Sequence, residues 1–211
     1  MPTLSPENFR DDRREAPAAR RNASAILDVL RRILPESGTV LEIGSGTGQH
    51  AAAFASALTP RRWLPSDPDP DQRASIASWI AEIDGAAPLA PRAINAASAD
   101  WDVRPEDGIT AIVTVNVVHI SPWAVCQGLV AGAGRLLPTG GVLYFYGPFK
   151  RAGQHTAPSN AAFDASLQAR NPEWGVRNLE DIAALGEDAA LVLDPVIDMP
   201  SNNFSAVFRR L

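Results

Sequence analysis

Three glycines separated by single residues, Gly44, Gly46 and Gly48, form the segment best suited to bind a ligand. They follow an apolar segment at 39–43 that predicts a short buried strand, and an alanine-rich stretch at about 47–58 predicts a helix after them. Glycine permits tight turning and close approach of a ligand to the backbone. The unpaired N–H groups at the start of the next helix favour an anionic group.

The spacing of these glycines distinguishes between ligand classes. A nucleoside triphosphate loop needs a lysine that is absent here, and a dinucleotide loop needs a glycine where Gln49 stands. The observed spacing, preceded by an acidic residue, is typical of sites for a sulfonium methyl donor. We therefore predict S-adenosylmethionine as the cofactor, with a purely structural turn as the alternative. The residues predicted to hold its methionine end are Glu42, Gly44, Ser45, Gly46 and Gly48.

Asp67 is the candidate for binding the ribose of this donor. It follows a predicted strand at 63–66, about 20 residues beyond the glycine loop, where a carboxylate can accept both ribose hydroxyls. His50, in the first turns of the helix after the loop, either contacts the methionine end or packs in the core.

Adenine recognition is expected after a third predicted strand within 88–94. Asn95 and the backbone of Ala96 are favoured for this role, because an amide oxygen can accept from the adenine amino group. Asp100 and Trp101 are alternatives, since a carboxylate can also accept and an indole can cover the ring.

The clearest predicted strand, at 109–118, delivers Asn116 and His119 to the expected site. Histidine titrates near neutral pH, so His119 is the candidate general base, with a packed histidine as the alternative. Asn116 is a candidate for both catalysis and cofactor binding.

The loop after the next predicted strand, at 141–146, carries the candidate substrate residues. These are Tyr146, Lys150 and His155, and the segment 148–160 could form a lid or a solvated loop. The three histidines of the chain lack paired ligand spacing, so no metal site is predicted.

Strands alternating with helices predict a Rossmann-like, doubly wound α/β fold with a seven-stranded, mostly parallel sheet. The last two predicted strands, at 190–193 and 203–208, flank a proline-containing turn at about 195–200 and predict an antiparallel hairpin at one edge. Residues 1–211 are expected to form a single domain, with 1–16 as a flexible or lid-like lead. The remaining predicted helices lie at about 26–34, 70–83, 124–137, 160–170 and 179–185.

Composition narrows the functional class further. The chain has 211 residues, 45% of them hydrophobic, and a formal net charge of −5 without a dense basic block, which disfavours nucleic acid as a partner. No apolar run approaches the roughly 20 residues of a membrane span. The single cysteine, Cys126, fits a reducing compartment, so a cytoplasmic location is expected. The oligomeric state is left open.

Together these residues resemble the class I S-adenosylmethionine-dependent methyltransferases and, more narrowly, the domain of unknown function 938 family. The resemblance covers about residues 15–211. The segments that carry it are Arg21-Asn22, 41–50, 65–67, 116–120 with Trp123, 146–150, Ser159-Asn160 with Phe163-Asp164, 170–172 and 200–203.

This resemblance implies the seven-stranded fold and the methyl donor but no particular substrate. Asn95 departs from it, because relatives are expected to carry an aspartate there. The leading hypothesis is a methyltransferase that acts on a small molecule by in-line transfer. A noncatalytic protein that binds the donor or a partner is the alternative, and the glycine spacing disfavours a nicotinamide-dependent oxidoreductase.

Overall fold

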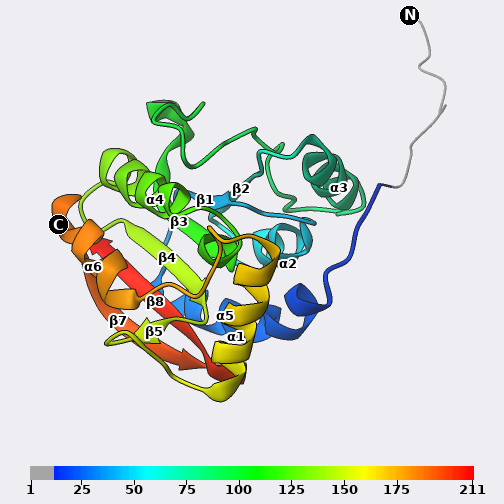
Figure 1. Cartoon of the computed structure of the whole chain (residues 1–211). Helices are drawn as coiled ribbons and strands as arrows, with labels where there is room; N and C mark the ends of the chain where they lie inside the picture. The colour runs from blue at the N-terminus through cyan, green and yellow to red at the C-terminus, as the bar shows by residue number, and fades with distance from the viewer. Residues whose placement is uncertain (1–11) are drawn as a thin grey trace, which may run out of the picture.

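A six-stranded sheet separates two layers of helices in the computed structural model, which describes residues 12–211 (Figure 1). The strand order is β2-β1-β3-β4-β8-β7. Strands β1 to β4 run parallel, because a helical crossover returns the chain to the same edge each time, whereas β8 is antiparallel to both β4 and β7. The carboxyl ends of four strands and the start of β8 therefore meet at one edge.

The bounds of the strands are β1 Thr39–Ile43, β2 Arg62–Ser66, β3 Ile109–Val115, β4 Val142–Gly147, β7 Leu191–Met199 and β8 Asn203–Arg210, with β5 Lys150–Arg151 and β6 Gln154–His155 forming a separate small hairpin. The helices are α1 Pro17–Ile33, α2 Gln49–Ala57, α3 Pro70–Ala81, α4 Trp123–Leu136, α5 Pro158–Arg170 and α6 Leu179–Asp188. Three short 3-10 helices are η1 Pro105–Asp107, η2 Val117–His119 and η3 Pro200–Asn202.

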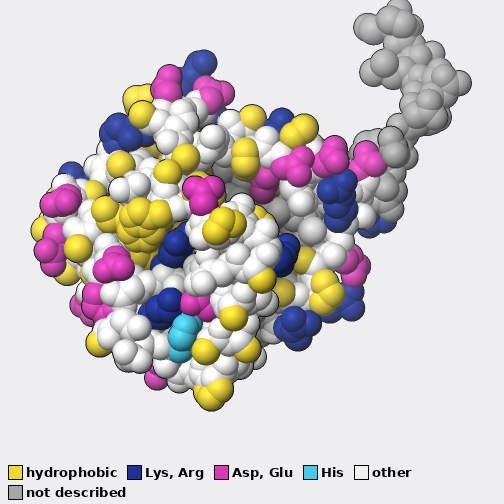
Figure 2. Space-filling model, viewed as in Figure 1, with side chains coloured by type: hydrophobic (Ala, Val, Ile, Leu, Met, Phe, Trp, Pro, Cys, Tyr) yellow, Lys and Arg dark blue, Asp and Glu magenta, His cyan; other side chains and the backbone are white. Residues whose placement is uncertain are grey.

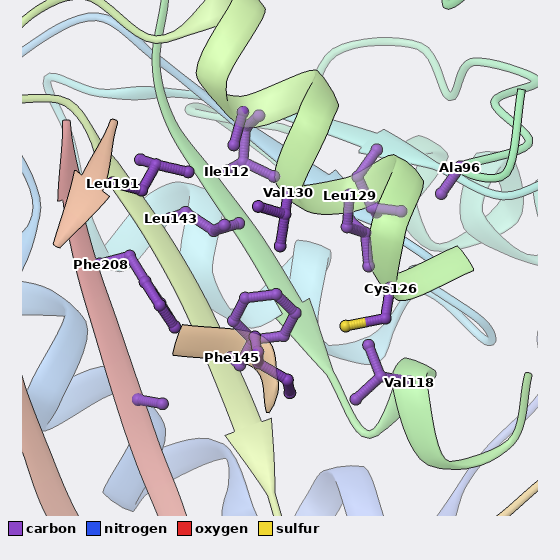
Figure 3. Packing of buried hydrophobic residues seen from close by; sticks show 14 of the residues in the cluster. Ala96, Ile112, Val118, Cys126, Leu129, Val130, Leu143, Phe145, Leu191 and Phe208 are labelled. Carbon is purple, nitrogen blue, oxygen red and sulfur yellow. The ribbon is translucent and has the colours of Figure 1, made fainter. Parts of the chain in front are cut away.

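Each face of the sheet has its own apolar core. Helices α1 and α2 cover one face, where Ile26, Leu30 and Phe54 are fully buried. Helices α4 and α6 cover the other, and Figure 3 shows Leu129 and Phe145 of that core. Strands β1 and β4 are buried along their whole length, which explains the continuous apolar runs in their sequences.

The expected third strand, at 88–94, is absent, so the sheet has six strands rather than seven. This segment lies beside β2 and exchanges three backbone hydrogen bonds with it and with Asp67, but they form only one isolated bridge, between Ser66 and Arg92. Pro88 and Pro91 have no N–H to donate, which prevents a continuous ladder. The rest of the predicted fold class is confirmed: a mixed α/β structure with a mostly parallel sheet and antiparallel C-terminal strands.

The C-terminal hairpin differs from the prediction in its turn. Strand β7 continues past Pro195 to Met199, with a register shift between Leu193 and Val196, and the chain reverses at η3. Proline is tolerated because β7 pairs only with β8 and so lies at the sheet edge, where a missing N–H need not remove a ladder bond.

The surface seen in Figure 2 mixes acidic and basic side chains and has no single basic stripe. Within residues 12–211, no helix has both the length and the apolar character needed to cross a bilayer.

Helix α4 lies directly against the segment that follows the missing strand. A Cβ placed on Gly128 would stand 1.8 Å from the carbonyl oxygen of Ala96, which is a backbone atom with little freedom to move. Glycine at this helical position therefore allows α4 to hold the 95–97 segment in place.

We predict that Gly128→Ala destabilises the protein by about 1–3 kcal/mol, because the added methyl overpacks this contact. Without the contact, alanine in a helix would instead stabilise by up to about 1 kcal/mol. Urea unfolding measures the difference, with Gln127→Ala on the exposed side of α4 as the control. A Gly128→Ala protein at least as stable as wild type would contradict the close packing.

Candidate active site

The glycine loop joins β1 to α2, and its three glycines all have positive φ. A Cβ on Gly44 would lie 2.5 Å from Val117 Cγ2, and one on Gly48 would lie 2.8 Å from Ile76 Cα. These two glycines are required by packing. A Cβ on Gly46 would meet no atom within 4 Å, so this glycine faces open space. The loop is thus held tightly at both ends and open to a ligand in the middle.

Asp67 lies next to this opening, at the end of β2. Its Oδ2 accepts a hydrogen bond of 2.9 Å from Gly46 N–H, and its Oδ1 accepts one of 3.0 Å from Asp69 N–H. Burial raises its pKa above the usual value, against the lowering effect of these two bonds. Each oxygen keeps a further lone pair for a hydroxyl donor.

A cavity of about 310 Å³ connects these groups with the segment at 94–96. Of the predicted cofactor residues, it brings together Gly44, Gly46, Asp67, Asn95 and Ala96. Further lining residues are Ile43, Pro68, Asp69, Gln72, Ile94, Val117, Ile120, Ser121 and Val125. A larger groove of about 490 Å³ lies between α4 and α6 and contains none of the predicted site residues.

The two alternatives for adenine recognition lie outside the lining of this cavity. Trp101 is buried in the core against Gly132 of α4, where a Cβ would lie 2.4 Å from its ring. Asp100 is exposed. Asn95 is also exposed, and its Oδ1 accepts a 3.0 Å bond from Ala97 N–H. The location of these residues thus favours Asn95 and Ala96 over the alternatives.

Glu42 lies behind the glycine loop instead of lining the cavity. Its Oε2 accepts hydrogen bonds from Trp63 Nε1 at 2.9 Å and from Ser45 Oγ at 3.0 Å. Burial raises its pKa to about 7, although these two bonds act in the opposite direction. Glu42 and Ser45 thus connect β1, β2 and the loop on the side of the loop that faces away from the cavity.

His50 faces α1, and it too is absent from the cavity lining. Its Nε2 forms a 2.8 Å hydrogen bond with Asn22 Oδ1, and its ring stacks on Phe54. Burial lowers the pKa of His50 to about 4, so the imidazole is neutral at physiological pH. In this position His50 fixes the side chain of Asn22.

A second, smaller cavity of about 150 Å³ lies where β3 and β4 end and β8 begins. Asn116 and Tyr146 line it together with Arg21 and Asn22 of α1 and Asn203 of β8. The two cavities are neighbours along the chain, because Asn116 lines this one and Val117 lines the first. Asn116 has a φ of 61°, a left-handed conformation that asparagine adopts more readily than most residues other than glycine.

His119 is fully buried under the chain that follows β4. Its ring packs edge-on against Phe149, and neither ring nitrogen makes a hydrogen bond of normal geometry within residues 12–211. Burial lowers its pKa to about 3, and the positive charge of Arg177 adds to this effect, whereas a backbone interaction with Gly175 opposes it. His119 is therefore a neutral group in this structure.

Lys150 and His155, the other predicted substrate residues, line neither cavity. Both contact the buried carboxylate of Asp164 on α5: Lys150 Nζ is 2.8 Å and His155 Nε2 is 3.2 Å from Oδ2. Asp164 Oδ1 also accepts a 2.8 Å bond from Val176 N–H. The two basic side chains thus attach the small β5–β6 hairpin to α5, and their role toward a substrate stays a prediction.

The end of the predicted lead, residues 12–16, crosses α3 next to the first cavity. Arg14 N–H donates to Ser75 Oγ at 2.9 Å, and Trp79 Nε1 donates to Arg14 O at 3.2 Å. Ser75 Oγ in turn donates to Thr47 O in the glycine loop at 2.8 Å. Gln49 Oε1 makes a second connection, because it accepts from Ala16 N–H and from Thr47 Oγ1. This segment is therefore connected to the loop through the side chains of Ser75 and Gln49, while the predicted lead at 1–11 lies outside the described residues.

The sequence predicts no role for three residues of the smaller cavity, Arg21, Asn22 and Asn203, although all three lie in segments that carry the family resemblance. Arg21 and Asn22 follow Arg20 near the start of a predicted helix, where polar side chains usually face solvent. Asn203 stands beside a predicted proline-containing turn, where an asparagine is explained by its preference for turns. The only signal that could have identified them is their recurrence in the family pattern.

Several methyltransferases of known structure are similar to this chain in fold. The chain aligns over 92% of its length with an O-methyltransferase family protein from Burkholderia thailandensis (TM-score 0.73, 17% identity, 57% of that chain). Over the same share of its length it aligns with human N-acetylserotonin methyltransferase in complex with S-adenosylmethionine (TM-score 0.71, 13% identity, 52% of that chain). It also aligns over 92% of its length with an O-methyltransferase family 2 protein from Planctomyces limnophilus in complex with apigenin (TM-score 0.71, 18% identity, 60% of that chain).

The chain therefore has the fold of these methyltransferases, and it spans only 52–60% of their length. The family described as "Protein of unknown function (DUF938)" matches residues 13–210, so the chain belongs to that family.

We predict that Glu42 gives the protein a distinct pH dependence of stability. Its pKa is about 7 in the folded state, against 4.5 for an unperturbed glutamate, so the folded state keeps a proton that the unfolded chain releases. The contribution of Glu42 to the free energy of unfolding should therefore fall as pH rises from about 4.5 to 7, by about 3 kcal/mol, and then level off. His50 and His119, whose pKa values are lowered, contribute stability that rises with pH in the same window, so the Glu42 effect is measured as a difference between two proteins.

Urea unfolding of wild type and Glu42→Gln across this range measures the effect, since the amide cannot titrate. The free energy of unfolding of wild type minus that of Glu42→Gln should decline across this range, whereas the same difference for the exposed Glu36→Gln should stay constant. Parallel stability profiles for wild type and Glu42→Gln would show that Glu42 is ionised in the folded protein.

Proposed function

We propose that this chain is an S-adenosylmethionine-dependent methyltransferase that acts on a small molecule. The observation that carries the proposal is the first cavity, in which Gly46, Asp67 and Ala96 converge next to a second polar cavity at Asn116. A cavity for the donor beside one for an acceptor is the arrangement that group transfer needs.

The residues of the first cavity fit the three parts of the donor. Asp67 has acceptor capacity for the ribose hydroxyls, and the open side of Gly46 lets the methionine end approach the backbone. Asn95 and Ala96 would hold adenine, against an apolar wall that includes Ile94 and Val117. Glu42 and Ser45 would not contact the donor but would fix the shape of the loop that binds it.

When bound, the donor supplies a methyl group on a positively charged sulfur; an acceptor lone pair bonds to the methyl carbon while the carbon–sulfur electron pair stays on sulfur. The protein's own part is to position the acceptor and exclude water. Asn116 is placed for this role because it lines the acceptor-side cavity.

The role of His119 as a general base becomes less favourable in this geometry. A Cβ on Gly147 would lie 2.4 Å from His119 Nε2 and 3.0 Å from Asn116 Oδ1, so both side chains converge beneath this glycine. With a pKa of about 3, a neutral His119 is a weak proton acceptor at pH 7. We therefore assign it the positioning of the chain around Asn116, with proton removal as the alternative role.

A noncatalytic donor-binding protein of the same fold is the second candidate. Both candidates bind the donor, so only acceptor-dependent formation of S-adenosylhomocysteine separates them. Incubation with donor labelled in its methyl group and a mixture of small organic acids, phenols and amines should yield a labelled small product. The absence of any labelled product, together with intact donor binding, would favour the noncatalytic candidate.

We predict that Asp67→Ala lowers the affinity for S-adenosylhomocysteine by about 100-fold, because hydrogen bonds from two hydroxyls to a carboxylate are lost. Isothermal titration calorimetry measures the change, with circular dichroism as the folding check. Asp100→Asn is the control, since Asp100 is exposed and outside the cavity lining. Equal losses in both variants, or none in Asp67→Ala, would argue against the proposed ribose contact.

We predict that removal of residues 1–16 weakens S-adenosylhomocysteine binding on the order of tenfold, because the contacts from Arg14 to Ser75 and Trp79 stabilise α3 beside the cavity. Removal of 1–11 alone keeps those contacts and is the matched control. Calorimetry on both truncated proteins gives the comparison. Unchanged affinity after the longer truncation would rule out a lid-like role for the lead.

A further inference from the structure

The smaller cavity has an unusual balance of charge. Its polar lining consists of Arg21, the amides of Asn22, Asn116 and Asn203, and the hydroxyls of Tyr146 and Ser201. No carboxylate, histidine or lysine of the described residues is part of this lining, and the other lining side chains are alanine and proline. Arg21 is thus the one formal charge in the lining, and most of the surrounding groups can donate hydrogen bonds.

Arg21 has no ion pair within residues 12–211, in contrast to its neighbours on the chain. Arg20 pairs with Glu15, and Arg31, further along α1, pairs with Asp28. An arginine at a cavity without a carboxylate partner can bind an anion through two parallel hydrogen bonds.

Tyr146 adds a hydroxyl donor to this lining. Burial raises its pKa above the usual value, whereas interactions with the side chains of Asn22 and Asn203 act in the opposite direction. The hydroxyl therefore stays protonated at pH 7 and can donate to an anionic oxygen.

The cavity is also formed in advance of binding. Asn116 and Ser201 both have left-handed φ values, 61° and 60°, which persist only when the surrounding structure enforces them. The η3 turn that carries Ser201 is attached to α5, because Asn160 Nδ2 donates to Asn202 O at 2.9 Å. On the other side, the hydrogen bond to His50 fixes Asn22.

The size of this cavity limits what can enter. At about 150 Å³ it matches the volume in which an engineered protein cavity holds one benzene molecule. The part of the acceptor that enters is therefore no larger than about one six-membered ring.

From the geometry and charge of this lining, we propose that the methyl acceptor is a small organic carboxylate, bound with its anionic group on Arg21 and its body beside Asn116 and Tyr146. The inference rests on the proposed methyltransferase function, and it specifies the substrate class.

Side-chain amide signals in ¹H–¹⁵N NMR spectra test the proposal without requiring turnover. Benzoate and benzamide have nearly the same shape but differ in charge, and each is titrated into the full chain with and without S-adenosylhomocysteine. Benzoate should shift the side-chain amides of Asn22, Asn116 and Asn203, with an affinity at least about tenfold higher than benzamide.

Three variants identify the group responsible. Arg21→Gln should remove the preference for benzoate and Arg21→Lys should keep part of it. Arg31→Gln, at an equally exposed arginine outside the cavity lining, should leave it unchanged. The proposal is overturned if benzoate and benzamide bind equally, if neither shifts these amides, or if Arg21→Gln keeps the preference.

The same titration separates this proposal from the proposed function. S-adenosylhomocysteine should shift the backbone amides of Gly46 and Ala96, independently of Arg21. Benzoate shifts without any response to S-adenosylhomocysteine would refute the methyl donor but leave the anion site standing. A response to S-adenosylhomocysteine without any preference for benzoate would do the reverse.

Discussion

The hydrogen bond from Gly46 N–H to the Asp67 carboxylate, at 2.9 Å, joins the ends of β1 and β2 into one wall of the larger cavity. Two tight contacts support it, at Gly44 against Val117 and at Gly48 against Ile76. The loop can therefore follow only this path, with its one open side at Gly46. Every later feature of the site depends on that path, because it determines where a ligand can approach the backbone.

The parallel sheet places the second cavity beside the first. Strand β3 ends between them, with Asn116 in one lining and Val117 in the other. Helix α1 contributes Arg21 and Asn22 to the second cavity, and the antiparallel β8 contributes Asn203. A terminal helix and an edge strand, both outside the parallel core of the sheet, thus complete the acceptor side.

The position of the glycine loop and Asp67 could be predicted from sequence because parallel strands deliver their carboxyl ends to one edge. Asn95 and Ala96 line the same cavity although no strand precedes them, because the 88–94 segment still runs beside β2. The orientation of Glu42 could not be predicted, since a strand buried on both faces has no alternation that reveals its direction. The position of the Lys150 side chain could not be predicted either, because its partner Asp164 is brought close only by the tertiary fold. The strand predicted at 88–94 does not form although the segment is largely apolar, because its prolines lack the N–H groups that a ladder needs.

A crystal structure of the full chain with S-adenosylhomocysteine tests the central claim most directly. The account predicts ribose oxygens within hydrogen-bond distance of Asp67, adenine beside Ala96, and sulfur facing the cavity lined by Asn116 and Tyr146. Adenosine bound in the groove between α4 and α6, or sulfur directed away from Asn116, would contradict it.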